Sequence, residues 1–305
     1  MDTTSPPAPL THPGERALVL AGGGAAGNAW QIGLVAGLAA AGVDLTRAEL
    51  IVGTSAGSTV AAQITCGPTP AELYAVILEE VPPRRPSGPA GSAGPRPAVS
   101  GPSYLEWSNA VIASAADAAD MRRRMGAAVL ELDRSDGSLA TRWRETVAAR
   151  LPGHDWPEQR VLIAAVDART GEPVVFDRDS GIDLVDAVAA STSAMTPYRI
   201  GENRYLNGGY RRSENADLAA GYGFVLVLSP FGGRSRMPSG WGMDLATQVA
   251  ELRAAGSRVV TVFPDAGSGE VFDANALDPS TRPPAARGGY AQGRALANEL
   301  ADLWA

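Results

Sequence analysis

The sequence predicts an α/β fold of three layers, α/β/α, in which helices cover both faces of a mostly parallel central sheet. Two observations predict this fold. Short apolar segments alternate with longer segments whose small and apolar residues recur at helical spacing. Several of the apolar segments also end in a tight turn that opens a helix, an alternation typical of parallel sheets covered by helices.

Two strand–turn–helix units follow one another at the start of the chain. Each begins with a short apolar strand, and each strand ends in a turn that contains glycine. A further helix comes next, with Thr69 as its cap and Pro70 at its first position. The segments that predict the two units are residues 16–24 and 49–57 for the strands and residues 27–42 and 58–67 for the helices.

The second half of the chain returns to strands after a mainly helical stretch at residues 104–150. Residues 159–170 and 172–179 predict a pair of strands joined by Thr170 and Gly171. The remaining predicted elements are a helix at 181–195, a strand and turn at 203–209, a strand at 223–230, a helix at 242–256, a strand at 257–265 and a final helix at about 287–304.

The predicted organisation is a single domain over residues 15–305. A polar, proline-rich stretch at residues 1–14 predicts a disordered tail. A Pro/Gly-rich stretch at about residues 82–102 predicts a flexible insertion. With 305 residues, 45% of them hydrophobic and 19% charged, the chain is long and apolar enough to bury a core.

Composition excludes several classes of function. A net charge of -7 gives no general attraction to nucleic acid or to anionic lipid surfaces. A lone cysteine, Cys66, excludes an internal disulfide, and only two histidines, His12 and His154, argue against a metal site. The sequence shows neither a secretory signal nor an apolar run of about 18 residues. We therefore predict a cytoplasmic protein with no cofactor, metal or transmembrane segment, and leave open its oligomeric state and transient contact with a membrane surface.

The segment GTSAG, from Gly53 to Gly57, fits the pattern G-x-S-x-G. In such a nucleophile elbow, a sharp turn between strand and helix projects the serine above the sheet, and the flanking glycines allow close backbone approach. The context fits, because an apolar strand precedes the turn and a helix follows it. The start of that helix also brings a partial positive charge near Ser55. We therefore predict that Ser55 is a nucleophile.

A second glycine-rich turn, GGGAAG from Gly22 to Gly27, also ends a strand and opens a helix. Three interpretations are open: a dinucleotide-binding turn, an oxyanion hole, or a turn that only lets helix and strand pack. The first requires an acid at the end of the second strand, but Asp44 precedes that strand. We favour the oxyanion hole. Its predicted donors are the backbone N–H groups of Gly22, Gly23, Gly24, Ala25 and Ala56.

These motifs resemble the patatin-like phospholipase family, which combines a glycine-rich loop, a later G-x-S-x-G elbow and a downstream Asp-Gly-Gly or Asp-Gly-Ala motif. The third motif corresponds here to Asn207-Gly208-Gly209, and Gly27, Gly208 and Gly209 are predicted supporting residues. The segments VDARTGEPVVFD and AVAASTSAMTPYRI are similar to the family's strand pair and to its helix and proline turn. The resemblance extends from about residue 16 to about residue 230 and implies the patatin-like fold.

Asn207 occupies the position of the family's aspartate. The resemblance implies that this aspartate activates Ser55 directly, as a dyad without histidine. Asparagine has nearly the same shape, but its amide cannot accept a proton at neutral pH. Two explanations are favoured: an engineered replacement of aspartate, or a natural variant that binds or reshapes a ligand. A third is that another carboxylate serves as base; the candidates are Asp217, Glu214 and Asp167, while His154 is predicted to be a surface loop residue.

The sequence therefore predicts a serine acyl hydrolase of the lipase, esterase or phospholipase type, or an acyltransferase. It would act through an acyl-enzyme at Ser55, weakened or inactivated by Asn207. The predicted substrate is a small acyl ester, a thioester or a lipid, and the lipid is implied by the resemblance alone. The alternative is a natural non-hydrolytic biosynthetic enzyme or a ligand-binding pseudoenzyme on the same fold.

Overall fold

The structure, a computed structural model, describes residues 10–80, 101–133, 137–268, 271–273 and 275–304. Within these ranges the strands are β1 (His12–Leu20), β2 (Leu50–Gly53), β3 (Arg160–Asp167), β4 (Pro173–Phe176), β5 (Tyr198–Ile200), β6 (Asn203–Asn207), β7 (Tyr222–Leu228) and β8 (Arg258–Val262). The helices are α1 (Gly24–Ala39), α2 (Ala56–Thr65), α3 (Pro70–Glu79), α4 (Gly101–Ala113), α5 (Ala118–Leu132), α6 (Ser138–Ala148), α7 (Leu184–Ser191), α8 (Leu245–Ala254) and α9 (Arg282–Trp304).

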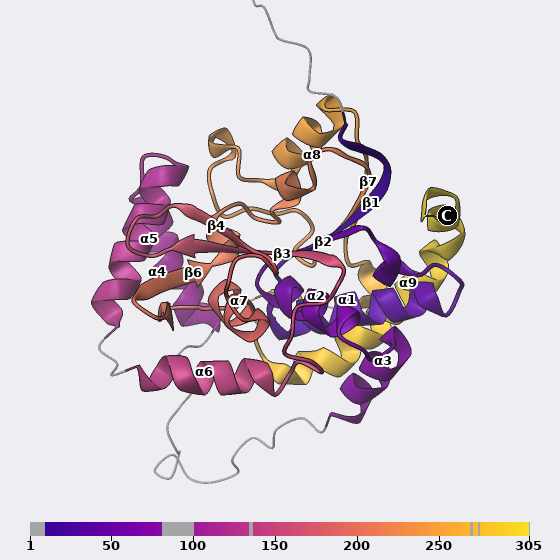
Figure 1. Ribbon diagram of the computed structural model, residues 1–305, viewed down its shortest axis with the longest axis horizontal. Coiled ribbons are helices and arrows are strands. Elements are labelled where there is room, and N and C mark those ends of the chain that lie inside the picture. The colour runs from indigo at the N-terminus through magenta and orange to yellow at the C-terminus, as the bar shows by residue number, and fades with distance from the viewer. Residues whose placement is uncertain (1–9, 81–100, 134–136, 269–270, 274, 305) are drawn as a thin grey trace, which may run out of the picture.

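One mixed sheet forms the middle layer, and helices lie on both of its faces (Figure 1). The strand order is β5-β6-β3-β2-β1-β7-β8, with β4 paired to β3. The strands from β3 to β8 in this order are parallel, whereas β4, β5 and β6 are joined by antiparallel pairing. The predicted three-layer α/β/α fold with a mostly parallel sheet is therefore confirmed.

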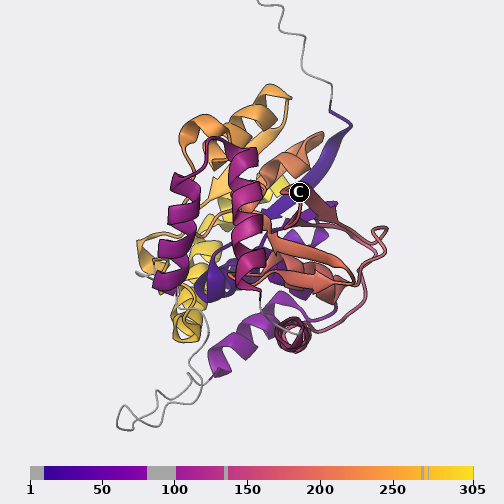
Figure 2. The same cartoon turned by 90° about the vertical axis from the view of Figure 1, so that its left-hand side faces the viewer.

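Alternate residues of the central strands pack into cores on opposite faces of the sheet. Leu18 and Leu20 of β1 belong to the larger core, which also contains residues of α1, α2, α7 and α9. Ala17 and Val19 of the same strand pack instead with residues of α8. A third apolar cluster lies at the antiparallel end of the sheet, where α4 and α5 stand side by side (Figure 2). This period of two is the pattern expected of a strand buried on both faces.

Helices α1 and α9 approach each other closely through glycines. A Cβ atom added to Gly33 would lie 2.1 Å from the carbonyl oxygen of Ala286, and one added to Gly37 would lie 2.2 Å from that of Tyr290. No side chain fits at such distances, so the two backbones can meet only where glycine is present. The glycines of α9 that meet the backbone of α1 in the same way are Gly289 and Gly293.

Some element boundaries differ from those predicted. Strand β1 begins at His12, inside the predicted tail, because His12 pairs with Tyr222 at the start of β7 and stacks on its ring. Helix α9 begins at Arg282 and includes two prolines in its first turn, where their missing N–H groups are not needed. Strand β5 was not predicted. Residues 1–9 of the predicted tail and 81–100 around the predicted insertion lie outside the described residues.

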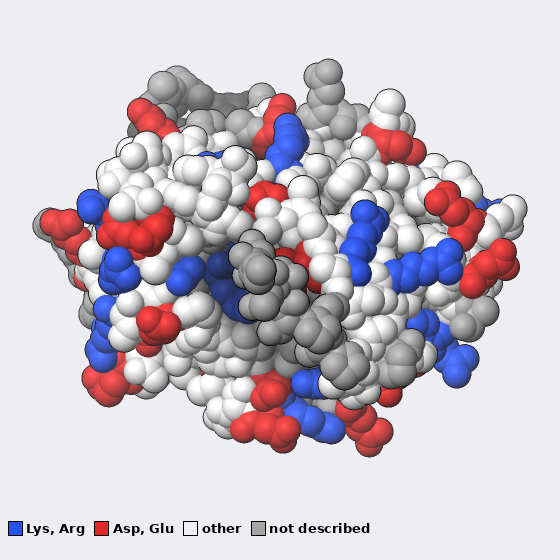
Figure 3. All heavy atoms as spheres, turned by 90° about the horizontal axis from the view of Figure 1, so that it is seen from above, with Lys and Arg blue, Asp and Glu red and all other residues white. Residues whose placement is uncertain are grey.

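The surface mixes charges of both signs. Figure 3 shows basic side chains lying among acidic ones over one face of the molecule. In the described part of the chain, no cluster of His, Cys, Asp or Glu side chains is arranged to hold a metal ion. None of the helices described is long and apolar enough to cross a membrane.

Replacing Gly37 with alanine is expected to lower the free energy of unfolding by up to about 2 kcal/mol. The overpacking cost of about 1–3 kcal/mol against the backbone of α9 exceeds the gain of about 1 kcal/mol in helix propensity. Urea denaturation measures the difference. Gly240→Ala is the control, because a Cβ there has no neighbour within 4 Å. A Gly37→Ala protein as stable as the unsubstituted chain would contradict the close packing.

Candidate active site

Ser55 lies at the sharp turn between β2 and α2. Its backbone has φ 52° and ψ -122°, a conformation that residues other than glycine rarely adopt. A Cβ on Gly53 would lie 2.6 Å from the Cα of Ser58, and one on Gly57 would lie 2.0 Å from the carbonyl oxygen of Leu20. Both glycines of the predicted elbow are therefore required by the close approach of the turn to α2 and to β1.

The glycine-rich loop between β1 and α1 lies beside Ser55. A Cβ added to Gly22 would be 3.2 Å from the Cβ of Ser55. Gly23 and Gly27 lie against Pro230, which follows β7. A Cβ on Gly23 would lie 2.6 Å from the Cβ of this proline, and one on Gly27 would lie 3.0 Å from it. The loop is thus held between the elbow and the end of β7.

The backbone N–H groups of this loop fall into two sets. Those of Ala26 and Gly27 donate to the carbonyl oxygens of Ala276 and Gly23, at 3.0 and 2.8 Å. The second set has no acceptor in any hydrogen bond between described residues, and consists of Gly22, Gly23, Gly24, Ala25 and, at the start of α2, Ala56. Such N–H groups at helix starts have no partner within the helix and suit a negatively charged oxygen.

Asn207 ends β6 and contacts the elbow serine directly. Its Nδ2 donates to Ser55 Oγ at 3.0 Å, while its Oδ1 accepts from the backbone N–H of Gly209 at 2.9 Å. Because the N–H of Gly209 can only donate, the amide oxygen must face it, which turns the amide nitrogen toward the serine. The side chain at 207 therefore donates to Ser55 Oγ, whereas a carboxylate in this place would accept from it.

Two further contacts hold Ser55 and Asn207 in place. A Cβ on Gly208 would lie 2.2 Å from the carbonyl oxygen of Ala164, so the turn after β6 lies directly on β3. The backbone N–H of Ser55 donates to Ser191 Oγ at 2.9 Å, at the end of α7. Sequence reasoning missed this role of Ser191, although the segment that contains it was one of those carrying the family resemblance.

Asp217, Asp167 and His154, the other side chains that could act as a base, form no hydrogen bond with Ser55 among the described residues. Asp217 forms an ion pair with Arg211 at 2.8 Å, and Asp167 accepts two backbone N–H groups in the turn that follows β3. His154 is exposed, as predicted. In the part of the chain that the structure describes, no hydrogen bond joins any of these side chains to Ser55.

Glu214, the remaining candidate, is a buried carboxyl group with 3% of its surface exposed. It accepts hydrogen bonds from the hydroxyl groups of Ser213 and Ser229, the latter at 3.0 Å. Burial raises the pKa of Glu214 above its ordinary value of 4.5, and the two serine hydroxyl groups offset only part of this rise. Its oxygens therefore face these serines, and no described hydrogen bond links them to Ser55.

A family model of patatin-like phospholipase matches residues 18–220. The chain belongs to the patatin-like phospholipase family. The matched segment of this patatin-like chain contains the glycine-rich loop, the elbow and Asn207. No curated protein matches the sequence.

Two solved structures are similar to the patatin-like chain. VipD from Legionella pneumophila has 14% sequence identity and a TM-score of 0.44, and the match covers 94% of this chain and 67% of VipD. The type III effector protein ExoU has 16% identity and a TM-score of 0.35, and the match covers 92% of this chain and 54% of ExoU. The chain thus spans about half the length of the second protein, at 54%.

The strained turn predicts that Ser55→Gly is more stable than Ser55→Ala, by about 1 kcal/mol. Both variants lose the hydroxyl group, but only glycine relieves strain of about 1–3 kcal/mol, against about 0.5–1 kcal/mol of extra unfolded-state entropy. Chemical denaturation of the two proteins measures the difference. Equal stabilities would mean that the turn at Ser55 stores no strain.

Glu214→Gln is expected to remove a fall in stability with rising pH. Because the folded pKa of Glu214 is raised, its contribution is fully present below the unfolded pKa near 4.5 and is lost as pH rises through the folded pKa. Denaturation is measured from below pH 4.5 to neutral pH. Across this window, the free energy of unfolding of the variant should rise relative to that of the unsubstituted chain. Glu79→Gln, at an exposed site, controls for the change in net charge. A parallel pH dependence for both Gln variants would contradict the assignment.

Proposed function

We propose that this chain carries an acyl-transfer site centred on Ser55, as a serine acyl hydrolase or acyltransferase, and that Asn207 limits its turnover. One observation carries the proposal: the side chain at 207 lies 3.0 Å from Ser55 Oγ. The N–H groups of the glycine-rich loop and of Ala56, for which no acceptor is found among the described residues, support it, because they begin the two helices that flank this pair. Membership of the patatin-like phospholipase family agrees with it.

The reaction follows from these positions. Ser55 Oγ attacks an acyl carbonyl carbon, and its proton passes to the side chain at 207 when that side chain is a carboxylate. The carbonyl oxygen becomes an oxyanion, which the N–H groups of Gly22–Ala25 and Ala56 stabilise. The leaving alcohol or thiol takes the proton as its bond to carbon breaks, and an acyl-enzyme is left. Water or another acceptor then attacks the acyl-enzyme and releases the acyl group.

Asn207 interrupts this sequence at the first proton transfer. Its Nδ2 donates to Ser55 Oγ, so the side chain at 207 presents no acceptor to the serine proton. Loss of a positioned general base costs about 10²- to 10⁴-fold in rate. The oxyanion donors and the nucleophile are unchanged, and serine hydrolases without a complete set of catalytic residues keep part of their rate. We therefore expect slow acylation rather than none.

The proposed substrate is an acyl ester, a thioester or a lipid. The attack at Ser55 needs only an acyl carbonyl and a leaving oxygen or sulfur, so it does not discriminate among them. Family membership favours a phospholipid or another lipid.

A second candidate function is binding of a ligand, or a non-hydrolytic reaction, at the same place. The direction of one hydrogen bond favours it: with Asn207 in place, both the residue at 207 and the surrounding backbone present donors. Such a site would hold the oxygen of a ligand without removing a proton from Ser55.

Asn207→Asp is expected to raise acylation of Ser55 by about 10²- to 10⁴-fold, because the side chain then accepts the serine proton. The measurements are the rate of Ser55 labelling by a fluorophosphonate and the turnover of a p-nitrophenyl ester. Ser55→Ala in both backgrounds is the control and should abolish the signal.

The outcomes separate the two candidates. If Asn207→Asp neither labels nor turns over ester, the acyl-transfer proposal fails and the binding function is favoured. If the unsubstituted chain is already as fast as the Asn207→Asp protein, the proposed limiting role of Asn207 is wrong.

A further inference from the structure

Asn215 is a fully buried side chain that joins the two loops of the proposed site. Its Nδ2 donates to Thr54 Oγ1 at 2.9 Å and to the carbonyl oxygen of Gly208 at 3.0 Å. Thr54 immediately precedes Ser55, and Gly208 immediately follows Asn207. One amide group is thus hydrogen-bonded to the neighbour of each member of the Ser55–Asn207 pair.

The chemistry of asparagine suits this place in two ways. The two hydrogens of Nδ2 serve the two loops, while Oδ1 accepts from Arg211 Nη1 at 2.8 Å, so every group of the amide is used. The backbone of Asn215 has φ 60° and ψ 31°, a left-handed conformation that asparagine tolerates better than most residues. An aspartate of the same shape could not donate to the carbonyl oxygen of Gly208.

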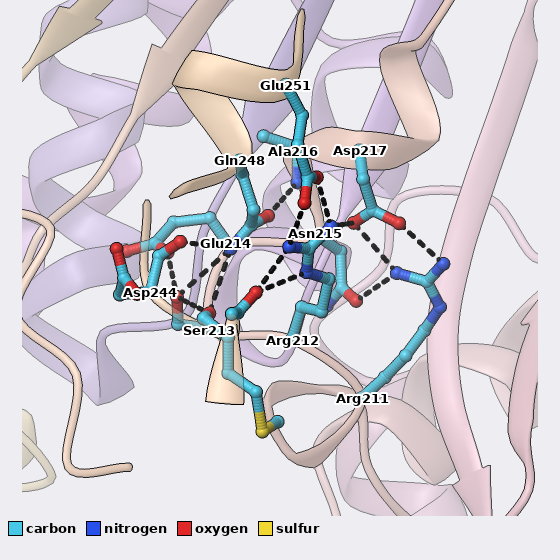
Figure 4. A network of polar contacts seen from close by, with 12 residues as sticks. Arg211, Arg212, Ser213, Glu214, Asn215, Ala216, Asp217, Asp244, Gln248 and Glu251 are labelled. Atoms are coloured by element: carbon cyan, nitrogen blue, oxygen red, sulfur yellow. Dashed lines mark hydrogen bonds and ion pairs between the residues drawn. The ribbon is translucent and has the colours of Figure 1, made fainter. Parts of the chain in front are cut away.

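Ion pairs and hydrogen bonds fix the segment that carries Asn215. Arg211 donates both to Asn215 and, through two parallel bonds at 3.0 and 2.8 Å, to the carboxylate of Asp217 (Figure 4). The neighbouring Arg212 forms a similar double contact with Glu251 of α8, at 2.6 and 3.0 Å. The backbone N–H of Ala216 donates to the buried side chain of Gln248 at 2.7 Å. The segment 211–217 is therefore fixed to α8, and Asn215 projects from it toward the elbow.

We propose that Asn215 is a positioning residue, which sets the separation of Ser55 and residue 207 by tying Thr54 to Gly208. This inference rests on the proposed function of the Ser55 site. Without the side chain of Asn215, no other described side chain donates to both loops. The elbow and the turn after β6 would then be free to shift relative to each other. Misplacement of reacting groups by about 1 Å costs on the order of 100-fold in rate.

The test uses the Asn207→Asp protein, in which acylation is expected to be fast. Asn215→Gly is added, because glycine accepts the left-handed backbone and removes only the side chain. The rate constant of fluorophosphonate labelling should fall about 10- to 100-fold, while the final fraction of labelled Ser55 stays complete. With a p-nitrophenyl ester, kcat should fall and KM should change little. A role limited to stability would instead lower the final labelled fraction and leave the rate constant unchanged, which would overturn the proposal.

Two variants sharpen the result. Asn215→Asp keeps the shape and the contact with Arg211 but loses the donor to Gly208, so it should slow labelling as Asn215→Gly does. Glu80→Gln is the matched control: it removes the double contact with Arg282, which lies outside the segment 211–217, and touches neither loop. It should leave the rate constant unchanged, and a loss equal to that of Asn215→Gly would refute a specific role for Asn215.

A second measurement does not depend on the proposed function. Hydrogen exchange on the unsubstituted chain and on its Asn215→Gly variant is followed in peptides that contain residues 53–57 and 207–209. Faster exchange in both segments together supports the link, and faster exchange in one or neither contradicts it. If Asn207→Asp fails to label, the proposed function fails, and this measurement still decides whether Asn215 ties the loops.

Discussion

Close backbone approach at one edge of the sheet is the constraint on which the site depends. Gly57 meets the carbonyl oxygen of Leu20 and Gly208 meets that of Ala164, at distances where a Cβ atom could not fit. These two contacts bring the start of α2 against β1 and the turn after β6 against β3. Ser55 and Asn207 can touch only because both approaches are made by glycine. Glycine is therefore needed at these two positions for the geometry of the site, and not only for the formation of the turns.

The features of the fold that the sequence predicted well are those with a local physical signal. The elbow and the glycine-rich loop each require a strand, a tight turn and a helix within a few residues, so their residues stand together in the chain. The cap at Thr69 follows the same rule, and the structure shows its capping box with Glu72. The parallel sheet was predictable because strands and helices alternate.

The features that the sequence did not reveal depend on contacts between distant segments. Ser191, which accepts a hydrogen bond from the backbone N–H of Ser55, lies 136 residues away in the sequence. Asn215 lies 161 residues from Thr54. Neither position has a local pattern that marks it, because its role is created by the fold. The identity of Asn207 was plain from the sequence, but the direction of its hydrogen bond was not. That direction is set by the N–H of Gly209, which only the folded turn brings to the amide oxygen.

The contact between α1 and α9 bears on how the chain folds as it is synthesised. Helix α1 carries the glycine-rich loop at its start, yet the backbone it packs against belongs to the last helix of this chain. Contacts of such sequence separation form late, because a long loop must close before they stabilise anything. On the ribosome, α1 is therefore synthesised well before α9 and lacks this packing partner until α9 has been made. That interval, rather than the finished fold, is where we expect this chain to depend most on chaperones.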